Sequence, residues 1–504
     1  MELTAECQQC IDDALTLYDF MSMAMNQIYL LNNNSVELDN GINCNIKLQC
    51  FIEDVKTGLF DSESGDFFIF PEVKQVLKEL IKEIDYFEDK DDKSSALVLY
   101  AILRGIDSKF MYNSNHSELG PLNTNLDLKF ILYRNLSPTL INPFIDFSGK
   151  KRVVSSAVCE SFDNYFFIDR DAWGTGKAIP FGIIVDSPLD TGLKIPDYRP
   201  IRIGISLFCS DKNFDFVSDV TKDLTIDYSS KAQDRFIKMA DRILDKAINN
   251  NCDFLVLPEY HTSQEVLDHI EKYLNHAFES GRNTPILTLA GSQWTDDNSN
   301  QMTILGKDGK KLGLYNKYSP YVGEVKTSEL TNRSGQPWAI DKLEVTEKLN
   351  NRDKNLVFFG INNVGVILPS ICRDAYDNDY TQVLVQKLHP LFVLISAWSP
   401  SLNSFRTPLK NLCCSYFVSS VFDNACSAIA KDRTDVGYCN TVCKHDTVLD
   451  ELSAEINRPF VACSHCDSGC LHIAEYNFGH HVENGKPDGH FEDPTLNIHC
   501  FVIE

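Results

Sequence analysis

The clearest helical pattern in the first 195 residues places apolar side chains three and four positions apart. The series is Val73, Val76, Leu77, Leu80, Ile81, Ile84 and Phe87. This spacing predicts an amphipathic helix whose apolar face packs on a core. The charged run 88–93 that follows predicts a solvated loop. Segments 129–136, 152–158 and 164–170 are typical of short strands, so residues 1–195 are predicted to form a mixed helical or α/β domain of unknown role.

A regular alternation of strands and helices begins after a stretch with three prolines, Pro188, Pro196 and Pro200. Prolines in a turn-rich stretch are typical of a linker, so we predict a domain boundary between residues 195 and 196. Strands are predicted at 201–208, 252–259 and 285–292, and the segments between them carry apolar residues at helical spacing. This order predicts an α/β domain with a largely buried sheet over 196–504.

Composition and charge narrow the class of protein. With 504 residues, of which 43% are hydrophobic and 23% charged, the chain has enough apolar material for two or three domains. The formal net charge of −24 opposes direct binding to nucleic acid or to anionic lipid. Acidic residues stand where a secretory leader would be basic, and no apolar run reaches the ~18 residues of a membrane span. We therefore expect a cytoplasmic protein whose 17 cysteines are mostly free thiols.

Three predicted strands end in reactive side chains. The run LVLPEY presents Glu259, LGLYNKYSPYVGE holds Lys317 and Glu324, and VGVILPSICRDAY ends in Cys372. The carboxyl ends of strands are where α/β sheets place ligands. A thiol, a base and a cation are the groups needed to attack a poorly electrophilic carbon such as that of an amide.

These segments, in this order, resemble the nitrilase superfamily of carbon–nitrogen hydrolases over about 300 residues, roughly 199–504. The family's "PE" stands here as Pro258-Glu259, its "Y-x-K" ends in Lys317, and its "G-V-x-x-C-x-D" runs from Gly365 to Asp374. The resemblance implies a four-layer αββα sandwich after the N-terminal domain. It also implies hydrolysis or acyl transfer at a non-peptide C–N bond through a cysteinyl thioester, with no metal or organic cofactor.

The resemblance further implies a role for each candidate residue. Cys372 would be the nucleophile, Glu259 the base and Lys317 the oxyanion partner, while Glu324 matches the family's second glutamate beside the lysine. We expect a small-molecule amide as substrate rather than a nitrile, bound by four residues, namely Tyr260, Arg373, Asp374 and Trp398. Taken singly, Cys372 would be interpreted as a buried structural thiol, and Glu259 and Lys317 as surface charges or an ion pair. Trp398 could equally be a packed core residue.

Several features leave alternatives open. Arg373 directly follows the nucleophile and the family's proline is missing after it, so the substrate class is uncertain. The charged interval 325–355 predicts either a lid over the pocket or a solvated insertion. Near the C-terminus Cys439, Cys443, Cys463, Cys466 and Cys470, with His465 and His472, suggest either a zinc site or the last strands of the sheet.

Partners follow from the same resemblance. Members of the family usually pair, so a homo-oligomer is expected. The N-terminal domain could bind a protein partner. The alternative function is a binding or assembly module in a multi-protein system, for example antiviral defence with a reverse transcriptase, because nitrilase-like domains occur linked to such enzymes.

Overall fold

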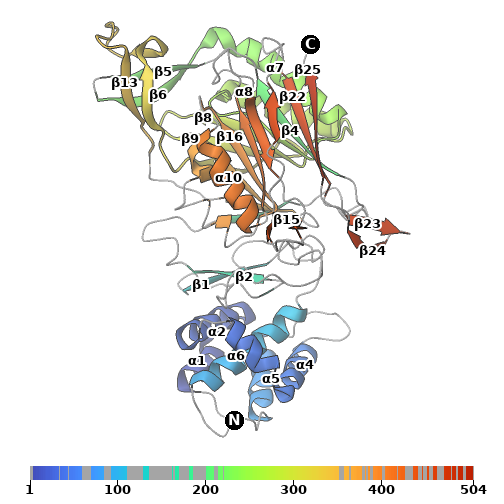
Figure 1. Cartoon of the computed structure of the whole chain (residues 1–504). Helices are drawn as coiled ribbons and strands as arrows, with labels where there is room; N and C mark the ends of the chain where they lie inside the picture. Colours follow the sequence, from blue (N-terminus) through green and yellow to red (C-terminus); the bar gives the residue numbers. More distant parts are fainter. Residues whose placement is uncertain are drawn as a thin grey trace. The chain divides into compact units, whose positions relative to one another are not determined.

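The computed structural model divides the chain into two compact units, Met1–Lys177 and Ala178–Glu504 (Figure 1). The residues that the structure describes are 4–32, 35–43, 45–59, 70–83, 92–109, 129–134, 162, 165–169, 181–185, 200–208, 214–219, 221–350, 357–361, 365–376, 381, 384–385, 390–399, 403–416, 418–425, 435–440, 445–446, 451–452, 458–461, 470–477, 480–483, 486–491 and 495–502.

Helices dominate the first unit. They are α1 (Ala5–Asp13), α2 (Leu17–Leu31), α3 (Ser35–Asn43), α4 (Ile46–Gly58), α5 (Phe70–Glu83) and α6 (Asp92–Lys109), followed by the antiparallel pair β1 (Phe130–Arg134) and β2 (Tyr165–Asp169). The predicted amphipathic helix is α5, whose Val73, Leu77 and Ile81 are buried in the unit's core. Helix α2 begins with a capping box between Thr16 and Asp19. The prediction of a mixed helical and α/β region is thus confirmed for the described residues.

The second unit is built around two large sheets. In the first, the strand order is β10 (Lys311–Asn316), β9 (Asn300–Gly306), β8 (Leu287–Trp294), β7 (Phe254–Val256), β4 (Ile201–Phe208), β22 (Cys470–Asn477) and β25 (Thr495–Val502). In the second, it is β21 (Arg458–Val461), β18 (Asp435–Asn440), β17 (Ser419–Asn424), β16 (Phe392–Ala397), β15 (Gly365–Ile371), β14 (Val357–Ile361) and β3 (Phe181–Val185). The same unit has two short antiparallel ribbons, β19 (His445–Asp446) with β20 (Glu451–Leu452), and β23 (His480–Glu483) with β24 (Lys486–Phe491).

Helices pack on both sheets, as their apolar patterns predict. The buried faces of α7 (Ser230–Asn249) and α8 (Gln264–Glu279) form one cluster with Leu255 of β7 and Leu471 of β22. Helix α10 (Asn403–Tyr416) places Phe405 on Phe422 of β17, with ring centroids 4.3 Å apart. Among the described helices, none combines the length and the apolarity needed to cross a bilayer.

The two large sheets also touch each other. Ser396 of β16 donates a hydrogen bond to the carbonyl oxygen of Leu257 at 2.7 Å. Phe392 of β16 packs edge-on against Tyr476 of β22, with centroids 4.9 Å apart. These contacts bring the end of β7 next to the end of β16.

A third sheet of five strands, which we call the accessory sheet, joins two distant parts of the chain. Its order is β11 (Val322–Lys326), β13 (Lys342–Glu347), β6 (Asp223–Tyr228), β5 (Phe214–Ser218) and β12 (Leu330–Asn332), and the short helix η4 (Thr327–Glu329) links β11 to β12. In Figure 1, β5, β6 and β13 stand together at one end of the second unit. The charged interval after residue 325 is therefore neither a free loop nor a simple insertion, because residues 325–347 supply strands to a folded sheet.

The predicted domain boundary lies too late in the chain. Strand β3 pairs in parallel with β14, with Phe181 opposite Val357, so it belongs to the second unit. The prolines that suggested a linker follow β3 instead of preceding the whole unit. The division falls between Lys177 and Ala178 rather than between residues 195 and 196.

Candidate active site

Three strand ends bring together the side chains that the sequence singled out. Glu259 follows β7, Lys317 follows β10, and Cys372 follows β15 as the first residue of the short helix η5 (Cys372–Tyr376). Strands β7 and β10 belong to one large sheet and β15 to the other. The three residues are 0%, 2% and 7% exposed. The predicted glutamate, lysine and cysteine thus lie in one buried cluster.

A glycine allows the chain to turn at Glu259. Gly291 of β8 has a φ of +74°, and a Cβ there would lie 2.5 Å from the carbonyl oxygen of Pro258 and 2.7 Å from Oγ1 of Thr262. A residue with a side chain would displace the backbone that carries Glu259. The close approach of β8 to this turn therefore depends on glycine.

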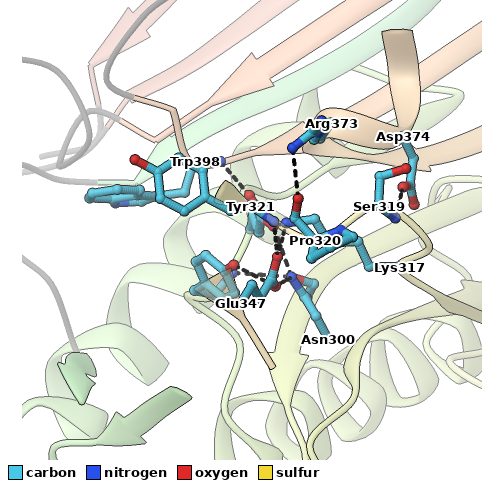
Figure 2. A network of polar contacts seen from close by, with 12 residues as sticks. Asn300, Lys317, Ser319, Pro320, Tyr321, Glu347, Arg373, Asp374 and Trp398 are labelled. Carbon is cyan, nitrogen blue, oxygen red and sulfur yellow. Dashed lines mark hydrogen bonds and ion pairs between the residues drawn. The ribbon is translucent and has the colours of Figure 1, made fainter. Parts of the chain in front are cut away.

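Lys317 lies between two carboxylates. Its Nζ donates to Oε1 of Glu259 at 2.8 Å and to Oε2 of Glu347 at 2.7 Å. Asn300 bridges the same two side chains, because its Nδ2 donates to Glu259 at 2.8 Å and to Glu347 at 3.0 Å (Figure 2). The second oxygen of Glu259 accepts from the backbone N–H of Trp398 at 2.8 Å. Both carboxylates are therefore held rigidly around one ammonium group.

Burial and charge set the protonation of this cluster. Burial lowers the pKa of the Lys317 ammonium, but the charges of Glu259 and Glu347 outweigh burial and hold that pKa well above its usual range. Burial raises the pKa of the Glu259 carboxyl, although the charge of Lys317 opposes the shift. The site thus sets one ammonium group between two carboxyl groups.

The thiol of Cys372 is protonated in this resting cluster. Burial raises its pKa well above the usual range, the charge of Glu259 adds to the shift, and the charge of Lys317 opposes it. A hydrogen bond between the thiol and Glu259 contributes in the same direction. The charge of Lys317 lowers the pKa of the thiol, but burial and the charge of Glu259 have the larger effect. The thiol consequently needs a base to become a nucleophile.

The backbone at Cys372 is unusual for a residue with a side chain. Its φ is +46°, in the left-handed region that non-glycine residues rarely occupy. The residue closes β15 and opens η5, so the strained turn presents the side chain at the end of the strand. Such turns are frequent at reactive residues.

The predicted second glutamate is not at the lysine. Glu324 lies on β11, where its side chain is 65% exposed and pairs with Lys342 at 3.1 Å. The position beside Lys317 is filled by Glu347, 30 residues further along the chain, at the end of β13. Glu324 lies elsewhere because the chain after Lys317 runs directly into the edge strand β11 of the accessory sheet.

The position of Glu347 beside Lys317, where Glu324 was expected, leads to a testable prediction. Glu347→Gln should lower turnover about 10- to 100-fold, because a charge-assisted hydrogen bond to Lys317 contributes roughly 1.5–3 kcal/mol. Glu324→Gln is the matched control, since an exposed ion pair contributes ~0–1 kcal/mol and should leave turnover within about twofold. Steady-state rates of the two purified variants show which of the two glutamates supports turnover. A larger loss of turnover in the Glu324 variant than in the Glu347 variant would show that Glu324, rather than Glu347, acts with Lys317.

Tyr260 and Trp398 lie beside the cluster, but their roles differ from a simple substrate contact. The hydroxyl of Tyr260 donates to Oε1 of Glu347 at 2.8 Å, and the residue is only 3% exposed. The ring of Trp398 packs on Phe216, with centroids 4.8 Å apart, and is half-buried. Both aromatic side chains thus join the core of the accessory sheet to the site, and Trp398 keeps an accessible face.

Arg373 and Asp374, which follow Cys372, contact the loop after Lys317. The carboxylate of Asp374 accepts from the backbone N–H groups of Tyr318 at 2.9 Å and Ser319 at 2.6 Å, and from the hydroxyl of Tyr315 at 3.0 Å. Burial raises the pKa of Asp374 to about 7. With three donors and no exposed surface, Asp374 is occupied within the protein and does not present its carboxylate to a substrate.

The suggested zinc site falls mostly outside the described residues. Cys443, Cys463, His465 and Cys466 are not described, while Cys439 and Cys470 lie in β18 and β22. His472 of β22 is buried, and burial lowers its pKa to about 4. Within the described ranges, no group of three or more His, Cys, Asp or Glu side chains is arranged so that it could hold a metal ion.

Comparisons with solved structures return an NAD+ synthetase, amidases and a carbon–nitrogen hydrolase. A glutamine-dependent NAD+ synthetase from Acinetobacter baumannii is 13% identical, with a TM-score of 0.32 over 55% of this chain and 46% of that chain. An amidase from Nesterenkonia sp. is 11% identical, with a TM-score of 0.33 over 55% and 90% of the two chains, and that amidase belongs to the nitrilase superfamily. A carbon–nitrogen hydrolase from Helicobacter pylori G27 is 11% identical, with a TM-score of 0.31 over 52% and 88%.

The chain thus spans about half the length of the synthetase it resembles. No family model matches the sequence, and no curated protein matches it. The function proposed below therefore starts from the residues of the site.

Proposed function

We propose that residues 178–504 form a carbon–nitrogen hydrolase of the nitrilase type, and that it hydrolyses an amide through a thioester on Cys372. The observation that supports this proposal most strongly is the buried Lys317 held between Glu259 and Glu347, with the thiol of Cys372 against Glu259. Burying an ion pair is costly, and a surface or structural role gives no reason to place a protonated thiol beside it. The same proposal includes the four-layer αββα sandwich, which the contacts of α7, α8 and α10 with the touching sheets support.

The first half of the reaction forms the thioester. Glu259 takes the proton of the Cys372 thiol as Sγ attacks the carbonyl carbon of the amide. Lys317 stabilises the negative charge that develops on the carbonyl oxygen. The C–N bond then breaks, the proton on Glu259 passes to the leaving nitrogen, and the amine departs as the acyl group stays on sulfur.

The second half restores the enzyme. Glu259 takes a proton from water, the water oxygen attacks the thioester carbon, and the C–S bond breaks. The sulfur recovers its proton from Glu259, and the carboxylic acid leaves. Glu347 holds no transferring proton in this scheme. Together with Asn300 it positions Lys317, and it stabilises the lysine's charge throughout.

A trapping experiment tests the proposal without knowledge of the natural substrate. The protein is incubated with a panel of short primary amides, and intact-mass spectrometry with peptide mapping locates any acyl group. We expect a thioester at Cys372 that hydroxylamine removes as a hydroxamate. Cys50, an exposed thiol in the first unit, is the internal control and should stay unmodified.

Two outcomes would contradict the hydrolase. Acylation of Cys50 at the same rate as Cys372 would mean that the site adds nothing to the reactivity of its thiol. Absence of a thioester and of released ammonia across the panel would favour a binding or assembly module instead.

A further inference from the structure

Arg373 holds a guanidinium group beside the nucleophile with most of its donors unused. Its NH1 donates to the carbonyl oxygen of Pro320 at 3.0 Å, as the dashed line in Figure 2 shows. Within the described part of the chain this is the only hydrogen bond of the side chain, and Arg373 takes part in no ion pair there. The residue is half-buried, so its charge is not simply dispersed in solvent.

The other charges described around the nucleophile are satisfied, which makes Arg373 an exception. Lys317 has two carboxylates, and Asp374 has three donors. Elsewhere in the unit, Arg202 and Arg282 each hold a carboxylate, at 2.9 and 2.7 Å. The chain has 71 acidic residues and 47 basic ones. A shortage of acidic residues therefore does not explain why Arg373 forms no ion pair in the described part of the chain.

The contact with Pro320 fixes which edge of the guanidinium is available. With NH1 engaged, the edge formed by Nε and NH2 presents two parallel N–H groups, the arrangement that matches the two oxygens of a carboxylate. Pro320 belongs to the loop between Lys317 and β11, so the same loop orients the catalytic lysine and Arg373.

An anionic substrate group near Cys372 is electrostatically favourable only if Arg373 binds it. The cluster sets the two carboxyl groups of Glu259 and Glu347 against the one ammonium group of Lys317, and the whole chain carries a formal net charge of −24. Both would repel a negatively charged substrate. An unneutralised guanidinium next to the nucleophile offsets this repulsion locally.

We propose that Arg373 binds a carboxylate of the substrate, so that the enzyme acts on an amide that carries a carboxylate close to the scissile bond. This inference rests on the proposed hydrolase function. Arg373 is the chain neighbour of Cys372, and adjacent Cα atoms lie about 3.8 Å apart, so the anion is bound a short distance from the reacting sulfur. Monoamides of short dicarboxylic acids have this separation between amide and carboxylate.

Two alkylating reagents that differ mainly in charge test the proposal. Iodoacetate carries a carboxylate where iodoacetamide carries a neutral amide, and peptide mapping gives both labelling rates at Cys372 and at exposed Cys50 in one sample. We expect the ratio of the iodoacetate to the iodoacetamide rate at Cys372 to exceed that at Cys50 about tenfold or more, as expected for a charge-assisted contact.

Three variants test whether Arg373 causes the higher rate ratio at Cys372. Arg373→Met should bring the ratio at Cys372 down to that at Cys50, while Arg373→Lys, which keeps the charge without the fork, should retain part of it. Arg282→Met, which removes an arginine paired with Asp245, should retain all of it. Thermal unfolding of each variant checks that the fold is intact. A second readout is ammonia release from succinic acid monoamide relative to butyramide, a preference that should fall in Arg373→Met.

The outcomes separate this inference from the hydrolase proposal. If iodoacetamide labels Cys372 and amides form a thioester there, but the rate ratio equals that at Cys50 or survives Arg373→Met, the carboxylate site is wrong and the hydrolase stands. If neither reagent labels Cys372 and no amide acylates it, the hydrolase proposal fails and the carboxylate site fails with it.

Discussion

Cys372→Ala should abolish turnover while leaving the fold in place. Removing a nucleophile that forms a covalent intermediate costs on the order of 10⁶ in rate, because no other group in the cluster can form the acyl–enzyme. The substitution deletes one sulfur atom from a side chain that is already almost buried, and alanine tolerates the φ of +46° no worse than cysteine. Ammonia release from the amide that gives the thioester is the measurement.

The matched control for this variant is Cys252→Ala. Cys252 is a buried thiol in the same unit, packed in the cluster of α7 and α8, and burial raises its pKa to about 12. Its variant should keep turnover near the wild-type value. Turnover in Cys372→Ala close to that of the Cys252 variant would eliminate the thioester mechanism.

Lys317→Met should have two separable effects, one on rate and one on stability. Loss of a single oxyanion donor costs about 10²–10³ in rate, and Lys317 is a charged one. The variant also leaves Glu259 and Glu347 buried together without their cation, and breaking a buried pair in this way costs roughly 3–5 kcal/mol. Steady-state rates measure the first effect, and chemical denaturation measures the second.

A double variant separates these effects. Lys317→Met combined with Glu347→Gln removes one of the two uncompensated charges, so it should recover part of the free energy of unfolding and none of the turnover. In the single variant the alkylation profile of Cys372 should move to higher pH, because the charge of Lys317 lowers the pKa of that thiol. Unchanged turnover and an unchanged alkylation profile in Lys317→Met would show that the lysine is not part of the site.

The sequence predicted the site best where a reactive residue closes a buried strand. Glu259 and Cys372 each follow a buried strand, whereas Lys317 follows β10, in which only Tyr315 and Asn316 are buried. Glu324 was expected beside Lys317 because of the resemblance to the nitrilase superfamily, but in this structure it pairs with Lys342 on β11. The chain leaves the site within a few residues of Lys317, as the 48% exposure of Val322 at the start of β11 indicates.

Glu347 could have been found from its strand. In β13 the buried positions are Leu343, Val345 and Glu347, so strict alternation places an acid on the apolar face. An acid on such a face needs a buried partner, which is a signal for a site. The pairing of β3 with β14 had no comparable signal in the sequence. The segment FGIIV predicts a strand but not the sheet that this strand joins, so the domain boundary was placed too late in the chain.

The accessory sheet also determines when the site can exist during folding. Thr346 of β13 pairs with Asp223 of β6, and Leu330 of β12 with Phe216 of β5, so strands more than 100 residues apart must meet in parallel. Closing a loop of that length costs entropy before any contact is gained, and pairings of this kind form slowly. Glu347, at the end of β13, reaches Lys317 only through this pairing. Assembly of the site therefore waits for two distant parts of the chain to meet, as does the first large sheet, where Ile203 of β4 lies opposite Ala474 of β22.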